Sequence, residues 1–257
     1  MTRPTLAGLR VEGSAGPALV LGQSLGTSSL LWDRAIPLLR EHFAVLSVDL
    51  PGHGESPAAR EPFTVGELAD AVVATATEAR IDRFFYAGVS LGGQVALELA
   101  LRHPDRVEGV AVICSAAKIG SEDAWRERAA TVRRQGTPVM VEGSAQRWFA
   151  PGFIEAQPDV AGALLRSLAF ADDESYALCC EALAGSDVRP RLSEIAVPVL
   201  ALWGQHDPVV SVEQARAVAE SVANGRGIEI AGAGHLAPAE NPEAVAAALI
   251  DSFRERQ

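Results

Sequence analysis

The sequence predicts an α/β fold with a mostly parallel sheet flanked by helices, and three observations lead to this prediction. Short apolar, β-branched runs alternate with longer helical patterns along the 257 residues, as in chains whose parallel strands are joined by crossover helices. Most of these runs are apolar at every position, as expected of strands covered on both faces. With 48% hydrophobic and 21% charged residues, the chain has the composition and length to bury a sizeable core.

The expected strands, in chain order, are 18–21, 44–48, 84–88, 107–113, 199–203 and 227–230. Two helices between them have recognisable starts. Thr64 with Glu67, and Ser211 with Gln214, have the spacing of capping boxes, in which two side chains satisfy each other's backbone donors. The last helix is expected to begin at Pro242 and to run to about residue 254.

The stretch from residue 118 to 191 interrupts this alternation. It has no convincing strand, and its helical segments are separated by glycine and proline, which end helices. We therefore expect residues 118–191 to form an inserted helical lid, and residues 1–117 and 192–257 to form the core.

Charge and cysteine content exclude several classes of protein. The 22 Lys and Arg against 33 Asp and Glu give a net charge of −11, which argues against binding nucleic acid or an anionic membrane. The chain shows no secretory signal and no run near the roughly 20 apolar residues that span a bilayer. Three cysteines, two of them adjacent, fit neither a disulfide framework nor a zinc site. We expect a cytoplasmic protein, either a monomer or a small homo-oligomer.

The strongest local motif is Gly88-Val89-Ser90-Leu91-Gly92, between an expected strand and a helical run. In this context Gly-x-Ser-x-Gly is typical of a nucleophile elbow, a strained turn that projects the serine into a cleft. The alternative is a glycine-rich turn with an incidental serine.

A serine nucleophile needs a base and an acid that orients the base. His235 follows the last expected strand in a glycine-rich loop, and Asp207 follows the strand 199–203. Taken alone, His235 could be a surface histidine and Asp207 part of an Asp-Pro turn. All three groups, however, follow expected strands, where α/β sheets place their sites. The sequence therefore predicts the triad Ser90, Asp207 and His235.

Two backbone N–H groups are expected to form an oxyanion hole, that of Leu91 after the nucleophile and that of Leu25 in the loop 22–27. A purely structural turn is the alternative for this loop. Cys114, Cys179 and Cys180 lack an elbow and are expected to be buried thiols, and His53 is assigned to a turn. The sequence has no metal-ligand spacing and no phosphate-binding or dinucleotide-binding glycine loop, so no metal or cofactor is expected.

Together, the segments 23–27, 49–56, 88–93, 204–208 and 234–235 make the chain resemble the α/β-hydrolase superfamily. Within that superfamily it resembles the 3-oxoadipate enol-lactonases of the β-ketoadipate pathway of aromatic breakdown. This narrower resemblance rests on residues 24–27, 118–120, 125, 147–149 and 176–189.

The resemblance implies cofactor-free hydrolysis of a small anionic lactone, 3-oxoadipate enol-lactone, through a serine acyl-enzyme. An arginine of the lid is the natural partner for the carboxylate of the substrate. The segment 118–148 holds six basic and four acidic residues, although a solvated helical face remains the alternative for each arginine. The expected substrate-binding residues are Ser24, Trp125, Arg128, Arg133 and Trp148.

Three other functions stay open at this point. The chain could be a general carboxylesterase or a cofactor-free haloperoxidase-like serine hydrolase. It could also be a non-catalytic ligand receptor on the same scaffold, although an intact triad argues against that interpretation.

Overall fold

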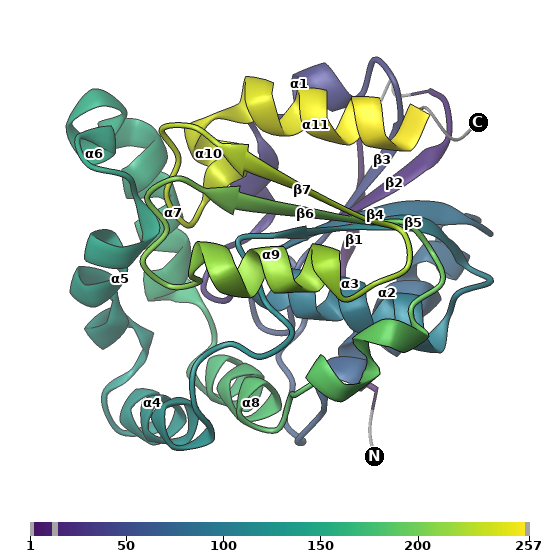
Figure 1. The fold of residues 1–257 in the computed structure, drawn as a ribbon. Helices are drawn as coiled ribbons and strands as arrows, with labels where there is room; N and C mark the ends of the chain where they lie inside the picture. Colours follow the sequence, from purple (N-terminus) through teal and green to yellow (C-terminus); the bar gives the residue numbers. More distant parts are fainter. Residues whose placement is uncertain (1–2, 12–14, 255–257) are drawn as a thin grey trace.

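A seven-stranded sheet runs through the molecule in the order β1-β3-β2-β4-β5-β6-β7 (Figure 1). The structure is a computed structural model that describes residues 3–11 and 15–254. All pairs of neighbouring strands are parallel except β1 with β3, which confirms the predicted sheet. The strands are β1 (Gly8–Arg10), β2 (Ala18–Gly22), β3 (Ala44–Val48), β4 (Phe84–Val89), β5 (Val107–Ile113), β6 (Val199–Gly204) and β7 (Gly225–Ile230).

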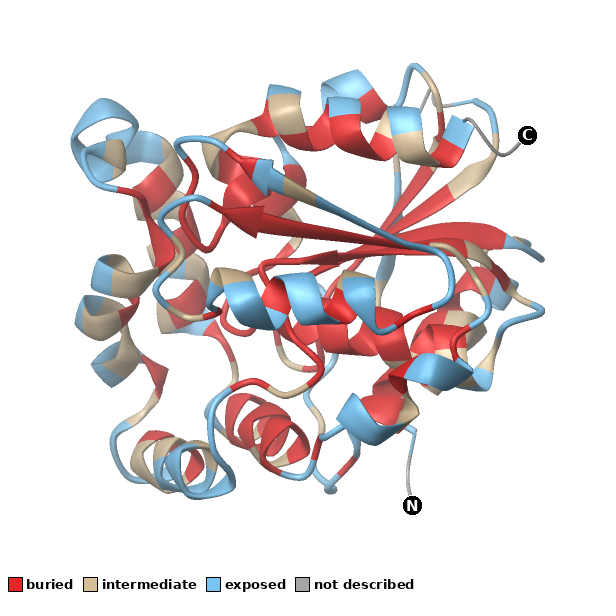
Figure 2. Ribbon diagram, in the orientation of Figure 1, coloured by how far each residue is buried: buried red, intermediate tan, exposed pale blue. Residues whose placement is uncertain are grey.

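Helices cover both faces of this sheet, which explains why most of the strand runs are apolar at every position. In Figure 1, α1 (Ile36–Leu39) and α11 (Pro242–Arg254) lie on one face. On the other lie α2 (Val65–Glu78), α3 (Leu91–Arg102) and α9 (Val212–Glu220). Figure 2 shows the central strands buried and the outer sides of the helices exposed. Short 3₁₀ helices occur at Ser29–Trp32, Thr137–Met140 and Arg189–Glu194.

The predicted helix starts are confirmed in atomic detail. Both capping boxes form, at Thr64 before α2 and at Ser211 before α9. The last helix has the predicted bounds, and Phe253 near its end stacks on Phe85 of β4 with ring centroids 4.5 Å apart. The C-terminal helix is thereby fixed to the centre of the sheet.

Five α-helices separate β5 from β6. They are α4 (Glu122–Gln135), α5 (Val141–Trp148), α6 (Phe153–Ala156), α7 (Pro158–Phe170) and α8 (Asp173–Ala184). In Figure 1, α5, α6 and α7 lie on the side toward which the arrowheads of β6 and β7 point. We keep the name lid for residues 118–191; its division from the core stays a prediction.

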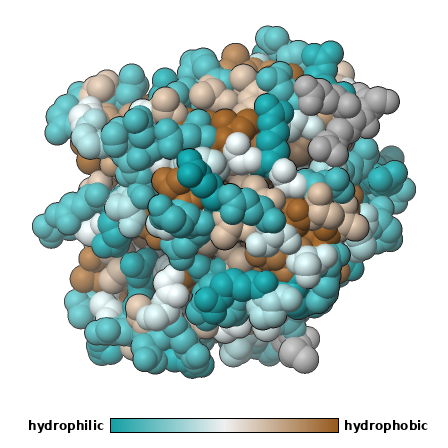
Figure 3. All heavy atoms as spheres, in the orientation of Figure 1, coloured by the Kyte–Doolittle hydropathy of each residue, from teal (hydrophilic) through white to brown (hydrophobic). Residues whose placement is uncertain are grey.

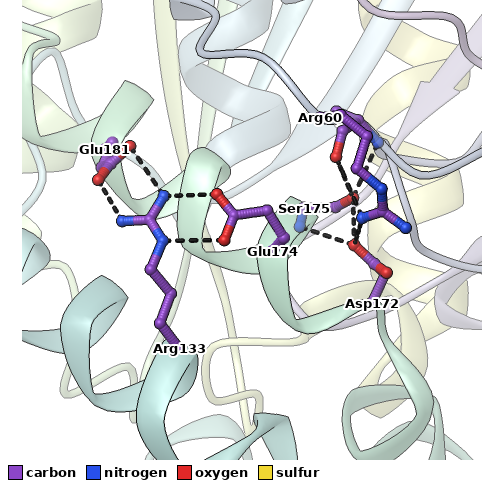
Figure 4. A network of polar contacts seen from close by, with 7 residues as sticks. Arg60, Arg133, Asp172, Glu174, Ser175 and Glu181 are labelled. Atoms are coloured by element: carbon purple, nitrogen blue, oxygen red, sulfur yellow. Dashed lines mark hydrogen bonds and ion pairs between the residues drawn. The ribbon is translucent and has the colours of Figure 1, made fainter.

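Two polar networks fix α8 in place (Figure 4). The Arg133 guanidinium of α4 forms ion pairs with Glu174 and Glu181 of α8. At the start of α8, Asp172 accepts from the Ser175 N–H and forms an ion pair with Arg60 of the core. The first network joins two lid helices, and the second joins the lid to the core.

Figure 3 shows one face of the molecule, where hydrophilic side chains predominate and apolar ones are scattered. Within the described ranges, no helix is both long and apolar enough to cross a membrane. The cytoplasmic location and the oligomeric state stay predictions from the sequence.

Candidate active site

Ser90 occupies a strained turn between β4 and α3. Its backbone has φ 57° and ψ −112°, a region that costs about 1–3 kcal/mol for a residue other than glycine. The turn is held by hydrogen bonds: the Ser90 N–H donates to the Ile113 carbonyl at 2.8 Å, and the Ser115 hydroxyl donates to the Ser90 carbonyl at 2.7 Å. The surrounding structure therefore fixes the backbone of the turn that carries the Ser90 side chain.

Glycine is required on both sides of this turn because the backbones approach too closely for a side chain. A Cβ at Gly88 would lie 2.1 Å from the Gly92 carbonyl oxygen, and one at Gly92 would lie 2.8 Å from the Gln23 carbonyl oxygen. The Gly-x-Ser-x-Gly pattern thus has a steric origin in this chain, and it brings the loop after β2 against the start of α3.

His235 and Asp207 form a buried pair beside the elbow. The His235 Nδ1 atom lies 3.0 and 3.1 Å from the two carboxylate oxygens of Asp207, and both side chains are almost fully buried. The loop 205–210 fixes the carboxylate, which also accepts from the Val209 N–H at 2.8 Å. This contact leaves the Nε2 edge of the imidazole for proton transfer.

The two predicted oxyanion donors lie in different segments, Leu91 at the start of α3 and Leu25 in the loop after β2. Leu91 is the first residue of α3, so its N–H has no acceptor within the helix. Leu25 lies in a turn in which the Thr27 N–H donates to the Ser24 carbonyl at 3.0 Å. Next to it, the Gly26 N–H donates to Nε2 of His53 at 3.2 Å, so the turn that contains His53 holds this loop.

One cavity joins most of the predicted site residues. Its volume is about 180 Å³, smaller than the roughly 300–1,000 Å³ typical of sites for drug-sized ligands, so it suits a small substrate. Of the predicted residues, the cavity lining includes Ser24, Leu25, Ser90, Trp125, Arg128, Trp148 and His235.

Two arginines line the same cavity. The Arg128 guanidinium stacks over the Trp125 ring, 4.7 Å from its centroid, and lies within hydrogen-bonding reach of the Tyr176 hydroxyl. Arg147 is half-buried, and burial together with the Arg128 charge lowers its pKa. Among residues 3–11 and 15–254, neither arginine forms an ion pair with a carboxylate. The cavity therefore presents two adjacent positive charges to a ligand.

Arg133, also predicted to bind substrate, lies elsewhere. Its guanidinium is held by Glu174 and Glu181 (Figure 4), and Arg133 does not line the cavity. Helical spacing explains the difference, because residues 128 and 133 of α4 are five apart and lie about 140° apart around the axis. Arg133 joins α4 to α8, and Arg147 takes its place in the proposal below.

The competing nucleophiles are buried. Cys114, Cys179 and Cys180 are free thiols in the core, and burial raises the pKa of each, which disfavours the reactive thiolate. Within the described ranges no group of three or more His, Cys, Asp or Glu side chains could hold a metal ion.

Reasoning from sequence overlooked three residues at the site: Arg147, His53 and Glu240. Arg147 is one of six basic residues in the segment 118–148, and nothing in the sequence marks it out as a substrate-binding residue. His53 was assigned to a turn without a partner, and its contact with Gly26 spans 27 positions. Glu240 follows His235 by five residues and binds the loop on both sides of it; its proximity to His235 was the available signal.

Comparison with known families agrees with this geometry. Residues 17–242 match the family model described as the alpha/beta hydrolase fold. The chain belongs to the α/β hydrolase family. The match covers the expected strands, the elbow, the acid and the base, so the fold implied by the sequence motifs is confirmed.

Two enol-lactonases and an esterase are among the proteins of known sequence or structure that this chain resembles. The chain is 38% identical over 228 residues to 3-oxoadipate enol-lactonase 2 of Acinetobacter baylyi, covering 89% of this chain and 85% of that protein. The crystal structure of the enol-lactonase from Burkholderia xenovorans superposes with a TM-score of 0.92 at 33% identity, over 97% of this chain and 96% of that one. A thermophilic esterase from Thermogutta terrifontis, solved with malate bound, superposes with a TM-score of 0.92 at 26% identity, covering 98% of this chain and 93% of that chain.

Proposed function

We propose that this α/β hydrolase opens 3-oxoadipate enol-lactone, a small lactone that carries a carboxylate, and releases 3-oxoadipate as a step of the β-ketoadipate pathway. The observation that carries the proposal is a pair of arginines, Arg128 and Arg147, in the same small cavity as Ser90 and His235; neither has a carboxylate partner among the residues that the structure describes. The similarity to the enol-lactonases of Acinetobacter baylyi and Burkholderia xenovorans supports the same substrate.

The reaction begins with attack of the Ser90 hydroxyl on the lactone carbonyl. His235 accepts the hydroxyl proton, and Asp207 at its Nδ1 atom stabilises the imidazolium that forms. The oxyanion binds to the N–H groups of Leu91 and Leu25. The ring C–O bond then breaks as the His235 imidazolium gives its proton to the ring oxygen, and the resulting enol, still part of the acyl-enzyme, tautomerises to a ketone.

The second half of the reaction uses the same groups. His235 removes a proton from water, and the resulting attack on the acyl-enzyme ester releases the acid and regenerates Ser90. No cofactor is needed, because both steps are acyl transfers in which only protons move besides the acyl group.

Lid residues recognise the substrate in this proposal. Its carboxylate binds between Arg128 and Arg147, where an anion relieves the repulsion of the two guanidinium groups. Trp125 and Trp148 form apolar walls, and Ser24, in the same loop as Leu25, also lines the cavity.

The deciding experiment compares the purified protein and Arg147→Gln on enol-lactone and on neutral p-nitrophenyl acetate. A hydrogen bond to a charged group contributes about 1.5–3 kcal/mol, so we expect KM for the lactone to rise at least about tenfold in this variant. The neutral ester should be hydrolysed at the wild-type rate, since it has no carboxylate to bind.

Arg126→Gln is the matched control, because Arg126 pairs with Glu122 on the solvent side of α4. Equal KM values for the lactone in wild type and Arg147→Gln would contradict the carboxylate site.

A general carboxylesterase is the second candidate, favoured by the superposition on the Thermogutta terrifontis esterase. Its signature would be a higher kcat/KM for p-nitrophenyl acetate than for the enol-lactone in the wild-type protein.

A further inference from the structure

Glu240 is a largely buried carboxylate that the proposed reaction does not use. It ends the short helix α10 (Ala237–Glu240), which begins two residues after His235. Its Oε1 atom accepts from the Gly234 N–H at 2.9 Å and from the Leu236 N–H at 3.3 Å. These two donors flank His235 in the chain, so one carboxylate oxygen fixes the backbone on both sides of the base.

The other oxygen of Glu240 reaches the lid. Oε2 accepts from the Ala150 N–H at 2.6 Å. Two residues earlier, the Trp148 carbonyl accepts from the N–H groups of His235 and Leu236 at 3.0 and 3.2 Å. Two hydrogen bonds to the Trp148 carbonyl thus join the lid directly to the loop of the base, and Glu240 bridges the same two segments through three more.

The charge of Glu240 also acts on the base. Burial raises the pKa of Glu240, while its three N–H donors and His235 favour the charged form. During the proposed reaction His235 becomes an imidazolium, and the Glu240 carboxylate then lies near a group of opposite charge. The other ionisable groups around the pair are Asp207, Cys114, whose thiol also experiences the Glu240 charge, and Arg34, which donates to the neighbouring Ala239 carbonyl.

We propose that Glu240 is a positioning residue for His235, which couples the loop of the catalytic base to the cavity wall at Trp148 and supplies a second negative charge behind the imidazole. This inference rests on the proposed triad and not on the proposed substrate. It assigns Glu240 no contact with the reacting atoms.

The test uses the nearly isosteric Glu240→Gln and a reagent that reports the triad without the lactone. With diisopropyl fluorophosphate, Ser90 Oγ forms a bond to phosphorus, fluoride leaves, and His235 takes the hydroxyl proton. Because a small displacement of a catalytic group can cost about 10²-fold in rate, we expect phosphorylation of Ser90 at the pH plateau to slow at least about tenfold. The acidic limb of the pH profile should move to lower pH, because the protonated base loses a stabilising charge.

Hydrogen exchange gives an independent measure of the coupling. In Glu240→Gln we expect faster exchange in the segments 149–151 and 234–236, which contain the three donors. Glu98→Gln is the control, because Glu98 is also a half-buried carboxylate whose pKa is raised by burial, but it lies on α3 beside Arg102. It should keep the wild-type rate and pH profile.

A folded Glu240→Gln with the wild-type plateau rate and limb position would overturn the proposal. If this variant does not fold, Glu240→Asp decides between the outcomes. Slower labelling of Ser90 with an unmoved acidic limb supports the proposal, and labelling at the wild-type rate overturns it.

Wild-type protein that reacts at Ser90 but leaves enol-lactone intact would refute the proposed substrate only. Failure of the wild type to react would remove the triad and this inference with it.

Discussion

His53 makes the stability of the protein depend on pH. The imidazole is fully buried: its Nδ1 atom lies 2.8 Å from the Pro51 carbonyl, its Nε2 atom accepts from the Gly26 N–H, and its ring stacks on Tyr176. These contacts require the neutral ring with its proton on Nδ1. Burial lowers the pKa of His53 from its ordinary 6.5 to about 4.

The sign and size of the effect follow from this shift. Between pH 6.5 and pH 4 the unfolded chain binds a proton at His53 that the folded chain does not, so acidification favours unfolding. At 1.36 kcal/mol per pKa unit, the loss of stability is about 2 kcal/mol between pH 7 and pH 5 and approaches about 3 kcal/mol below pH 4.

Urea unfolding at pH 7 and pH 5 measures this loss directly. In His53→Gln the titrating ring is absent, so we expect the difference in unfolding free energy between the two pH values to be smaller than in wild type by about 2 kcal/mol. His206→Gln, at an exposed histidine next to the proposed acid, is the control and should keep the wild-type difference. The same pH difference in wild type and His53→Gln would refute the reasoning.

Three further predictions concern the elbow, the acid and a helix start. Gly88→Ala places a Cβ 2.1 Å from a backbone oxygen, and we expect a loss of at least about 3 kcal/mol in stability, seen as a lower Tm; an unchanged Tm would contradict the close approach. Asp207→Asn keeps the size of the side chain but favours the wrong imidazole tautomer, so kcat for any ester substrate should fall by about 10⁴-fold; a loss below tenfold would exclude Asp207 as the acid. Thr64→Ala removes one half of a capping box and should lower stability by about 1 kcal/mol in urea with kcat unchanged, whereas altered kcat would indicate that α2 affects the site.

The sequence predicted the central strands well because they are buried on both faces. Six of the seven strands have the predicted positions to within two residues. The exception is β1, whose three residues are all exposed and pair with the edge of the sheet. Neither a continuous apolar run nor a regular alternation can arise in so short an exposed strand, so no pattern in the sequence could have revealed it.

The residues of the site also differ in how well the sequence predicts their positions, according to whether their contacts are local or distant in the chain. Ser90 and its glycines are recognisable because they fall within five consecutive residues. The close approach at Gly88 involves Gly92 only four residues on, whereas the one at Gly92 involves the distant Gln23. The position of Arg133 could not be predicted, because its partners Glu174 and Glu181 are 41 and 48 residues away. In the sequence, Arg128 and Arg147 cannot be distinguished from the other arginines of the lid. Only tertiary packing decides which arginines line the cavity and which form ion pairs with carboxylates.

The insertion of the lid between β5 and β6 also bears on how the chain folds. These neighbouring strands pair with Val110 opposite Val199. The long loop that contains the lid must therefore be closed before this part of the sheet can form. The entropy of closing a flexible loop grows only with the logarithm of its length, by about 0.6 kcal/mol per doubling. Stability is therefore nearly indifferent to the length of the lid, whereas the folding rate falls when contacts are distant in sequence. A chain built in this way can exchange the residues over its cavity during evolution while its sheet stays unchanged.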